Sequence, residues 1–255
     1  MSIVAYLVRH GEVEHHRTDV SLTPRGREQA EAAGAVLAAR LTAGDTVTIQ
    51  HSPVRRVVET AELLRASLSS ALTTAGYAGR IAVSPPQPDE ALCNVRFILE
   101  PGREPEEPSL LHMQINTPAY LQAAPPARAE FYRGFWSSND PMGYWLTHDS
   151  AGAAETPAVV LNRLQTRLKT LFAASARPKR GAAPVRPKRG PSANLHWIGV
   201  THSGAMRVLL QWAFRQDPGE PNFCEVISIE PAAASHRATL SYRGQTALVP
   251  IAESR

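Results

Sequence analysis

Short apolar runs alternate along this 255-residue chain with longer stretches in which apolar residues recur every three or four positions. The short runs are rich in β-branched residues, which favours buried strands. The longer stretches are typical of helices that bury one face. We predict strands at 3–8, 46–50, 81–83, 196–201, 226–230 and 239–242, and helices at 24–41, 57–64, 157–171 and 205–214.

Two of the predicted helices have clear start signals, because Thr23 precedes Pro24 and Thr156 precedes Pro157. Threonine is a common N-cap, and proline fits the first helical position, where its missing N–H is not needed. Strands that alternate with helices indicate an α/β fold with a largely parallel sheet. The sequence therefore predicts a three-layer α/β/α sandwich with a mostly parallel central sheet.

Two segments interrupt this alternation. Residues from about 91 to 155 contain many prolines and half of the aromatic residues of the chain. We interpret this segment as an inserted cap whose aromatic side chains pack its own core. Residues 177–190 contain the sequence RPKRG twice, interrupted by proline and glycine, which predicts a mobile basic loop. We expect residues 1–255 to form one domain that carries both segments.

The net charge of +4 comes from one place in the chain. Residues 177–190 hold six basic residues and no acidic one: Arg177, Lys179, Arg180, Arg186, Lys188 and Arg189. Without these six, 21 basic residues face 23 acidic residues. The basic excess therefore belongs to this segment, and we do not expect a nucleic-acid partner for the domain.

Composition excludes several other classes of protein. An apolar content of 43% is that of a globular protein, and no apolar run reaches the roughly 18–20 residues of a membrane span. The first residues, MSIVAYLVRHG, lack the basic and long apolar regions of a signal peptide. Cys93 and Cys224 are too few for a disulfide scaffold. We expect a cytoplasmic protein without membrane attachment.

Arginine and histidine residues stand at three predicted junctions between a strand and a helix. Arg9 and His10 follow the first strand, His51 and the Arg55–Arg56 pair follow the second, and His202 follows the strand at 196–201. In an open α/β sheet these strand ends share one crevice, where helix N-termini favour anions. Guanidinium groups bind phosphate oxygens in a bidentate way. The pattern indicates a phosphate site where an imidazole can act as nucleophile.

Three motifs resemble those of the histidine phosphatase superfamily, also called the phosphoglycerate mutase-like family. They are LVRHGE at 7–12 with LTPRGREQA at 22–30, HSPVRRVVETA at 51–61, and VTHSGAMRVLL at 200–210. Their order along the chain is that of the family. The tripeptide RHG alone is a weak signal, whereas three motifs at three strand ends are a specific one.

The resemblance implies a role for each motif residue. His10 is the nucleophile that becomes phosphohistidine, Arg9 and one arginine of the 55–56 pair hold the phosphoryl oxygens, and His202 donates to the same group. The family places its arginine four residues before a threonine, and Thr60 therefore selects Arg56 over Arg55. Three further motif residues are expected to bind substrate: Gly11, His16 and Ser203.

The resemblance also implies an acid that protonates the leaving oxygen. The expected residue is Glu90 in the segment PDEALCN, and the adjacent Asp89 is the alternative. His16 falls where many members of the family carry asparagine. Because Glu12 and Glu14 flank His15 and His16, a rival hypothesis is a metal site that includes His10, although the usual zinc spacings are absent.

The leading hypothesis is a phosphatase that hydrolyses a small phosphomonoester without a metal or cofactor. One alternative is a mutase of the phosphoglycerate type, which needs additional cations for a second anionic group. The candidates for these cations, each of which can also be surface charge, are Arg96, Arg103, Arg128 and Arg133. The other alternative is a binding module in which the RPKRG repeats hold a polyanionic partner. The sequence leaves open which phosphomonoester is used and whether the protein forms a homo-oligomer.

Overall fold

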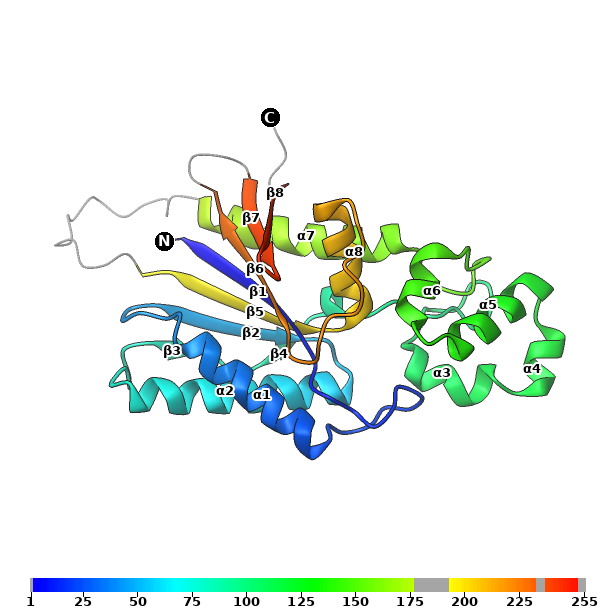
Figure 1. Ribbon diagram of the computed structural model, residues 1–255, viewed down its shortest axis with the longest axis horizontal. Helices are drawn as coiled ribbons and strands as arrows, with labels where there is room; N and C mark the ends of the chain where they lie inside the picture. The colour runs from blue at the N-terminus through cyan, green and yellow to red at the C-terminus, as the bar shows by residue number, and fades with distance from the viewer. Residues whose placement is uncertain (1, 177–192, 233–236, 252–255) are drawn as a thin grey trace.

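An eight-stranded mixed sheet forms the centre of the molecule in a computed structural model that describes residues 2–176, 193–232 and 237–251 (Figure 1). Its order is β3-β2-β5-β1-β6-β7-β8, and β4 pairs with β2. The parallel strands are β1 (Ile3–Arg9), β2 (Thr46–His51), β3 (Ala82–Val83), β4 (Gln87–Pro88) and β5 (Leu195–Thr201). The antiparallel strands are β6 (Val226–Pro231), β7 (Arg237–Tyr242) and β8 (Gln245–Pro250).

The predicted fold class is confirmed, because helices cover a sheet that is mostly parallel at its centre. The strand prediction for 81–83 shortens to Ala82–Val83, and the sequence analysis did not include β4 or β8. The antiparallel pairing of β6 with β1 also was not predicted. Strand direction depends on how distant segments meet, and the local apolar pattern does not contain it.

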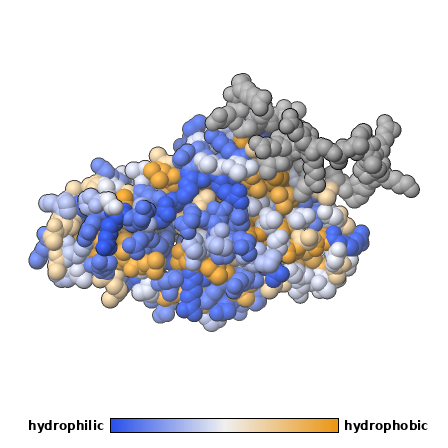
Figure 2. All heavy atoms as spheres, turned by 180° about the vertical axis from the view of Figure 1, so that it is seen from behind, coloured by the Kyte–Doolittle hydropathy of each residue, from blue (hydrophilic) through white to orange (hydrophobic). Residues whose placement is uncertain are grey.

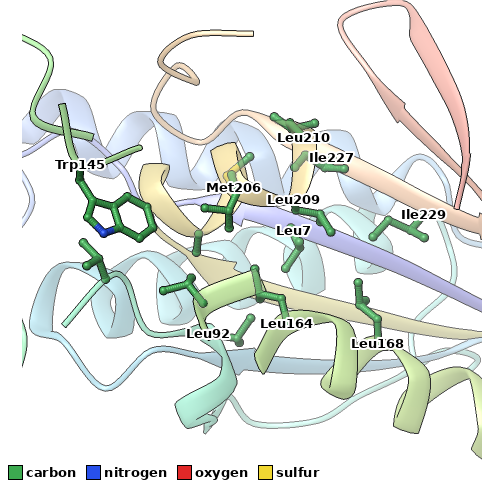
Figure 3. Close-up of a cluster of buried hydrophobic side chains, with 14 of the residues drawn as sticks. Leu7, Leu92, Trp145, Leu164, Leu168, Met206, Leu209, Leu210, Ile227 and Ile229 are labelled. Carbon is green, nitrogen blue, oxygen red and sulfur yellow. The ribbon is translucent and has the colours of Figure 1, made fainter. Parts of the chain in front are cut away.

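Helices α1 (Pro24–Ala38) and α2 (Arg55–Thr74) cover one face of the sheet, and α7 (Pro157–Ala176) and α8 (Ser203–Phe214) cover the other (Figure 1). The pleat of β1 sorts its side chains between these layers. Tyr6 and Val8 join the cluster beneath α1 and α2, while Ala5 and Leu7 join the cluster beneath α7 and α8. Figure 3 shows the second cluster, in which side chains from the sheet, α7 and α8 converge.

Four short helices lie at one end of the sheet, between η1 (Glu90–Leu92) and α7 (Figure 1). They are α3 (Pro108–Ile115), α4 (Pro118–Ala123), α5 (Pro126–Ser137) and α6 (Pro141–Thr147). Each begins with a proline, as α1 and α7 do. The prolines that set this segment apart in the sequence are therefore helix starts. These helices lie within the segment of about 91–155 that was predicted as the cap, and we keep that name for the segment.

Aromatic side chains fill the interior of the cap. The ring centroids of Phe97 and Phe135 lie 4.9 Å apart, and Phe131 packs against the edge of Phe97. The buried Trp145 donates from its indole nitrogen to the Glu155 carbonyl at 2.8 Å. These residues belong to the same apolar cluster as α7, α8 and one face of the sheet. The cap is thus packed continuously against the main core.

The face shown in Figure 2 is mainly hydrophilic, with hydrophobic residues between the polar ones. Within the described ranges, no helix is both long enough and apolar enough to span a membrane. The basic loop predicted at 177–190 lies outside the described residues.

Candidate active site

A pocket of about 310 Å³ lies where β1 and β5 end and the cap begins. Its sheet side holds the motif residues Arg9, His10, His16, Arg56, His202 and Ser203. Asn94 and Glu220 complete this side, and the cap side consists of Glu107, Pro108, Ser109, Phe135, Trp136, Asn139, Asp140, Pro141 and Met142. Residues from three separate sequence motifs therefore meet in one pocket, as the parallel strand ends predicted.

The His10 ring is held in a defined tautomer. Its Nδ1 lies 2.8 Å from the Gly11 carbonyl, which can only accept, so Nδ1 carries the hydrogen. Burial lowers the pKa of His10 well below its ordinary value, and Arg56 and His202 lower it further. The neutral ring then keeps a lone pair on Nε2. This is the form that a nucleophilic imidazole requires.

His202 meets His10 edge to face, with 5.4 Å between the ring centroids. Its Nδ1 accepts from Arg56 at 3.3 Å because a guanidinium can only donate, and its Nε2 therefore donates to the Ser52 hydroxyl at 3.0 Å. Burial, followed by the charge of Arg56, lowers the pKa of His202 well below its ordinary value. The ring thus orients Arg56. To donate to a phosphoryl oxygen, Nδ1 must first take up a proton, which a phosphate dianion nearby would favour.

Arg56 is almost completely buried, at 1% exposure, in the first turn of α2. It donates to Glu107 Oε1 at 2.6 Å and to the Ser109 hydroxyl at 3.5 Å. Arg55 next to it lies on the surface and pairs with Glu59 at 3.3 Å. The structure therefore places Arg56 in the pocket and Arg55 outside it, as the spacing to Thr60 indicated.

Arg9 ends β1 and lies at the other side of His10. Its guanidinium pairs with Glu220 Oε1 at 2.7 Å, donates to the Pro221 carbonyl and lies 4.2 Å from the centre of the Phe223 ring. These contacts fix the direction of the guanidinium. Arg9 and Arg56 together give the sheet side of the pocket two positive charges, both already held by carboxylates.

Glu107 is a buried carboxyl group, and the sequence analysis did not select it. It stands at the N-cap position of α3, and its Oε2 is buried without a hydrogen-bond partner among the described residues. Burial raises the pKa of Glu107, although Arg56 beside it acts in the opposite direction. A carboxyl group with a raised pKa that contacts Arg56 and lines the same pocket as His10 is suited to proton transfer.

Glu90 does not lie in this pocket, contrary to the expectation from the sequence. Its side chain is 71% exposed, lies 3.5 Å from Arg96 and accepts from the thiol of Cys93. Asp89, the alternative, caps η1 and pairs with Arg167 at 2.6 Å. Neither Glu90 nor Asp89 lines the pocket that holds His10.

The three predicted substrate-binding residues differ in position. His16 and Ser203 line the pocket, and the His16 ring centroid lies 5.5 Å from that of His10. Burial, with Arg56 and Arg9, lowers the pKa of His16. Gly11 does not line the pocket. Its N–H donates to the Thr60 hydroxyl at 3.0 Å. Gly11 instead holds His10 through its carbonyl.

The first turn of α8 also faces the pocket through Ser203. Its N-cap residue, His202, makes no side-chain capping hydrogen bond. The first N–H groups of a helix lack intrahelical partners, and the helix dipole favours an anion at that end. The Ser203 hydroxyl donates to Glu220. The pocket therefore combines a helix N-terminus with the two guanidiniums.

The described residues do not form the metal site that the sequence suggested around His10, His15 and His16. In the part of the chain that the structure describes, no group of three or more His, Cys, Asp or Glu side chains is arranged to hold a metal ion. His15 Nδ1 accepts from the Arg17 backbone N–H at 3.3 Å. The neighbours of His10 are instead the rings of His16, His202 and Phe223.

The four cap arginines that a second anionic group would need lie outside the pocket. Arg96 pairs with Glu155 at 2.8 Å, and Arg103 lies near Glu100 on the surface. Arg128 is buried and donates to the Ile98 carbonyl, while Arg133 is exposed. None of them serves the pocket.

Sequence reasoning missed the residues that the cap and the C-terminal loop supply. Glu107 follows two other glutamates in the segment REPEEP, and only the proline after it, which starts α3, distinguishes it. Nothing in the local pattern marks Asn94 or Glu220. Their positions depend on contacts across the fold.

Comparisons with known proteins agree with the motifs. Residues 5–76 match the model of the histidine phosphatase superfamily (branch 1), and the predicted resemblance is confirmed. No curated protein matches the chain.

The fold has counterparts among solved structures. Mycobacterial hydrolase 1 is 20% identical, with 97% of this chain and 100% of that chain covered and a TM-score of 0.53. Mycobacterial hydrolase 2 is 20% identical, with 97% and 93% covered and a TM-score of 0.51. Phosphoglycerate mutase from Bacillus anthracis str. Sterne is 14% identical, with 98% and 92% covered and a TM-score of 0.50. At these identities the likeness shows a shared fold.

Proposed function

We propose that this chain, in which residues 5–76 match the histidine phosphatase superfamily model, is a phosphatase that hydrolyses a small phosphomonoester through a phosphohistidine at His10. The observation that carries the proposal is the neutral His10 ring, whose Nδ1–H is held by the Gly11 carbonyl in a pocket lined by Arg9 and Arg56. A phosphoryl group needs a nucleophile and positive charge around its oxygens, and the pocket supplies both.

In the first step the Nε2 lone pair of His10 forms a bond to phosphorus while the ester P–O bond breaks. The leaving oxygen takes the proton of the Glu107 carboxyl group. A phosphate dianion next to Glu107 favours the protonated carboxyl, since like charges repel, and burial already raises its pKa. The hydrogen bond from Nδ1 to the Gly11 carbonyl stabilises the positive charge of the phosphorylated ring.

In the second step water attacks phosphorus and the P–N bond breaks, returning its electron pair to Nε2. The Glu107 carboxylate takes the proton of the water, which restores the acid for the next cycle. Arg9 and Arg56 hold the phosphoryl oxygens in both steps and exchange their contacts with Glu220 and Glu107 for contacts with phosphate. The products are an alcohol and inorganic phosphate.

Phosphoglycerate mutase chemistry is the alternative, and Bacillus anthracis phosphoglycerate mutase shares the fold. A mutase holds a substrate with two anionic groups. The pocket offers cations only near His10 within the described ranges, and Arg96, Arg103, Arg128 and Arg133 lie elsewhere. This distribution of charge supports hydrolysis over mutase transfer.

The proposal is tested with p-nitrophenyl phosphate, a general phosphatase substrate. We expect a rapidly quenched reaction to contain a phosphopeptide that includes His10 and is labile in acid and stable in alkali. His10→Ala should abolish both the phosphopeptide and turnover. A protein that turns over this substrate normally after His10→Ala would contradict the mechanism.

Arg55 and Arg56 provide a matched pair for the same assay. Arg56→Ala should lower kcat/KM by about 10²–10³-fold, because it removes a donor to the transition state. Arg55→Ala should leave kcat/KM within about twofold, because an exposed ion pair contributes little. Equal losses in the two variants would exclude the assigned role of Arg56.

A further inference from the structure

The pocket has two ends with different chemistry. The phosphate end contains His10, Arg9 and Arg56. The other end is walled by the cap, where Pro108, Phe135, Trp136, Pro141 and Met142 present apolar surface. In a phosphomonoester bound at His10, the alcohol part must occupy this second end. The side chains there therefore decide which alcohol the enzyme accepts.

The charged side chains that border the second end are acidic: Asp140 lies on the cap, and Glu220, which pairs with Arg9, lies between the two ends. Asp140 and Glu220 line the pocket, with side-chain exposures of 49% and 44%. Both contact Arg207, which also pairs with Asp217, so three carboxylates surround this one guanidinium. Arg207 lies beneath them, at 2% exposure, and does not line the pocket. Three carboxylates here face two guanidiniums, those of Arg9 and Arg207, so this side of the pocket keeps an excess of negative charge.

Positive charge is confined to the phosphate end. Arg9 and Arg56 are the arginines that line the pocket in the described part of the chain, and both are needed for the transferred phosphoryl group. The lowered pKa values of the lining histidines His10, His16 and His202 favour their neutral forms before a ligand binds. A second phosphate or a carboxylate on the substrate would meet Asp140 and Glu220 without a free cation.

Besides the Nε atoms of Arg9 and Arg56, three polar side-chain atoms of the pocket lining have no hydrogen-bond partner among the described residues. Asn94 Oδ1 and Glu107 Oε2 are buried acceptors, and Trp136 Nε1 is a buried donor. All three residues line the pocket. An unpaired buried polar atom costs free energy that a ligand can recover. Hydroxyl groups suit this set, because each hydroxyl both donates and accepts.

We infer that the substrate is the monophosphate ester of a polyol, such as a sugar or sugar alcohol, with no second anionic group. This inference rests on the proposed phosphatase activity and adds its substrate class. Hydroxyls bind Asn94 and Trp136, and carbon atoms pack on Phe135 and Met142. The negative charge beside Asp140 and Glu220 disfavours bisphosphates and phosphorylated carboxylic acids.

Three substrates with the same three-carbon skeleton test this inference. Propyl phosphate has no hydroxyl, glycerol 3-phosphate has two, and 3-phosphoglycerate replaces one of them with a carboxylate. We expect kcat/KM for glycerol 3-phosphate to exceed each of the other two values at least about tenfold, the ratio that about 1.4 kcal/mol produces. Comparable turnover of 3-phosphoglycerate, or of propyl phosphate, would overturn the inference.

Two variants assign the charge effect to the pocket. Asp140→Asn keeps the helix cap to the Gly143 N–H and removes the negative charge. It should raise kcat/KM for 3-phosphoglycerate relative to glycerol 3-phosphate by at least about threefold, since it reduces like-charge repulsion. Asp149→Asn removes the same charge from an exposed cap residue outside the pocket and should leave the ratio unchanged. Equal ratios in the wild type and Asp140→Asn would contradict the role of this charge.

p-Nitrophenyl phosphate separates failure of the inference from failure of the proposed function. Turnover of this substrate with no preference for glycerol 3-phosphate would leave the phosphatase proposal standing and refute the substrate class. No turnover of any ester, together with no phosphohistidine, would refute the phosphatase proposal itself.

Discussion

Glu107 and Glu90 carry the same carboxyl group in opposite surroundings. Glu107 is 9% exposed and contacts Arg56, whereas the Glu90 side chain is 71% exposed and lies near Arg96. Burial raises the pKa of Glu107. A general acid must carry a proton and must reach the leaving oxygen; Glu107 lines the pocket and its raised pKa favours the protonated form, whereas Glu90 does not line the pocket.

The two glutamates therefore give a matched test. Glu107→Gln should lower kcat/KM for glycerol 3-phosphate by about 10²–10⁴-fold, the usual contribution of general acid catalysis. The loss should be much smaller for p-nitrophenyl phosphate, because nitrophenolate leaves without a proton. Glu90→Gln should leave both substrates unaffected. A larger loss in Glu90→Gln than in Glu107→Gln would return the role to Glu90.

The pH dependence follows from the same groups. His10 must be neutral, and its lowered pKa moves the acid limb of kcat/KM below the ordinary range of imidazole. Glu107 must be protonated, so activity on an alkyl phosphate falls as pH rises through its raised pKa. In the Glu107→Gln assays this alkaline limb should be absent, which a merely structural role of Glu107 would not produce.

At the scale of helices and strands, prolines and close contacts position the site. α3 begins at Pro108, directly after Glu107, so the start of the helix places the carboxyl group at the pocket. α1 and α2 approach closely at Gly34, where a Cβ atom would overlap with the Leu64 carbonyl. α8 approaches Asn94 and Met142 at Gly204. The contact at Gly34 supports the packing of α1 on α2, and the contact at Gly204 shapes the pocket.

Alanine at these two glycines should separate stability from activity. Gly34→Ala places a Cβ atom in overlap with the Leu64 carbonyl oxygen, a backbone atom that cannot move easily. It should lower the free energy of unfolding by about 1–3 kcal/mol without changing kcat/KM of the folded protein. Gly204→Ala places a Cβ atom 2.5 Å from Asn94 Oδ1 and 2.6 Å from Met142 Sδ, both ends of side chains that line the pocket. It should change stability by under about 1 kcal/mol.

Kinetics and urea denaturation check this prediction. Because Asn94 and Met142 must move into the pocket, Gly204→Ala should reduce kcat/KM for glycerol 3-phosphate by about tenfold, a loss of about 1.4 kcal/mol in the transition state. If Gly204→Ala instead unfolds at much lower urea with unchanged kinetics, the contact is structural and does not shape the pocket.

At the scale of the whole molecule, the residues that set the net charge are not the residues that give the pocket its positive charge. The basic segment 177–190 accounts for the positive balance, yet it lies outside the described residues, and the cations of the pocket are Arg9 and Arg56. Two arginines among 27 basic residues meet the proposed phosphoryl group. Their effect depends on burial and direction, which a count of charges does not include.

Deletion of 177–190 tests this separation. We expect the shortened protein to keep kcat/KM within about twofold, since it retains every residue that lines the pocket within the described ranges. Retention on a heparin column is measured in parallel. Unchanged turnover with weaker retention would support the polyanion-binding hypothesis for this segment, while a large loss of turnover would give it a part in catalysis.

The sequence by itself determined the alternation of strands and helices and the identity of the motif residues at the strand ends. Periodicity, helix-start residues and the position of His10 after β1 are local properties, so they can be read without knowing the fold. The pocket positions of Arg9, His10, Arg56 and His202 followed from the parallel strands.

Only the tertiary structure decided which carboxyl group and which arginines belong to the site. Glu107 meets Arg56 across 51 residues of chain, whereas Glu90 lies outside the pocket, exposed and beside Arg96. The antiparallel end of the sheet and the position of Arg96 depend equally on distant contacts. Burial, charge pairing and direction arise when separate segments pack together, and these quantities set the chemistry of a side chain.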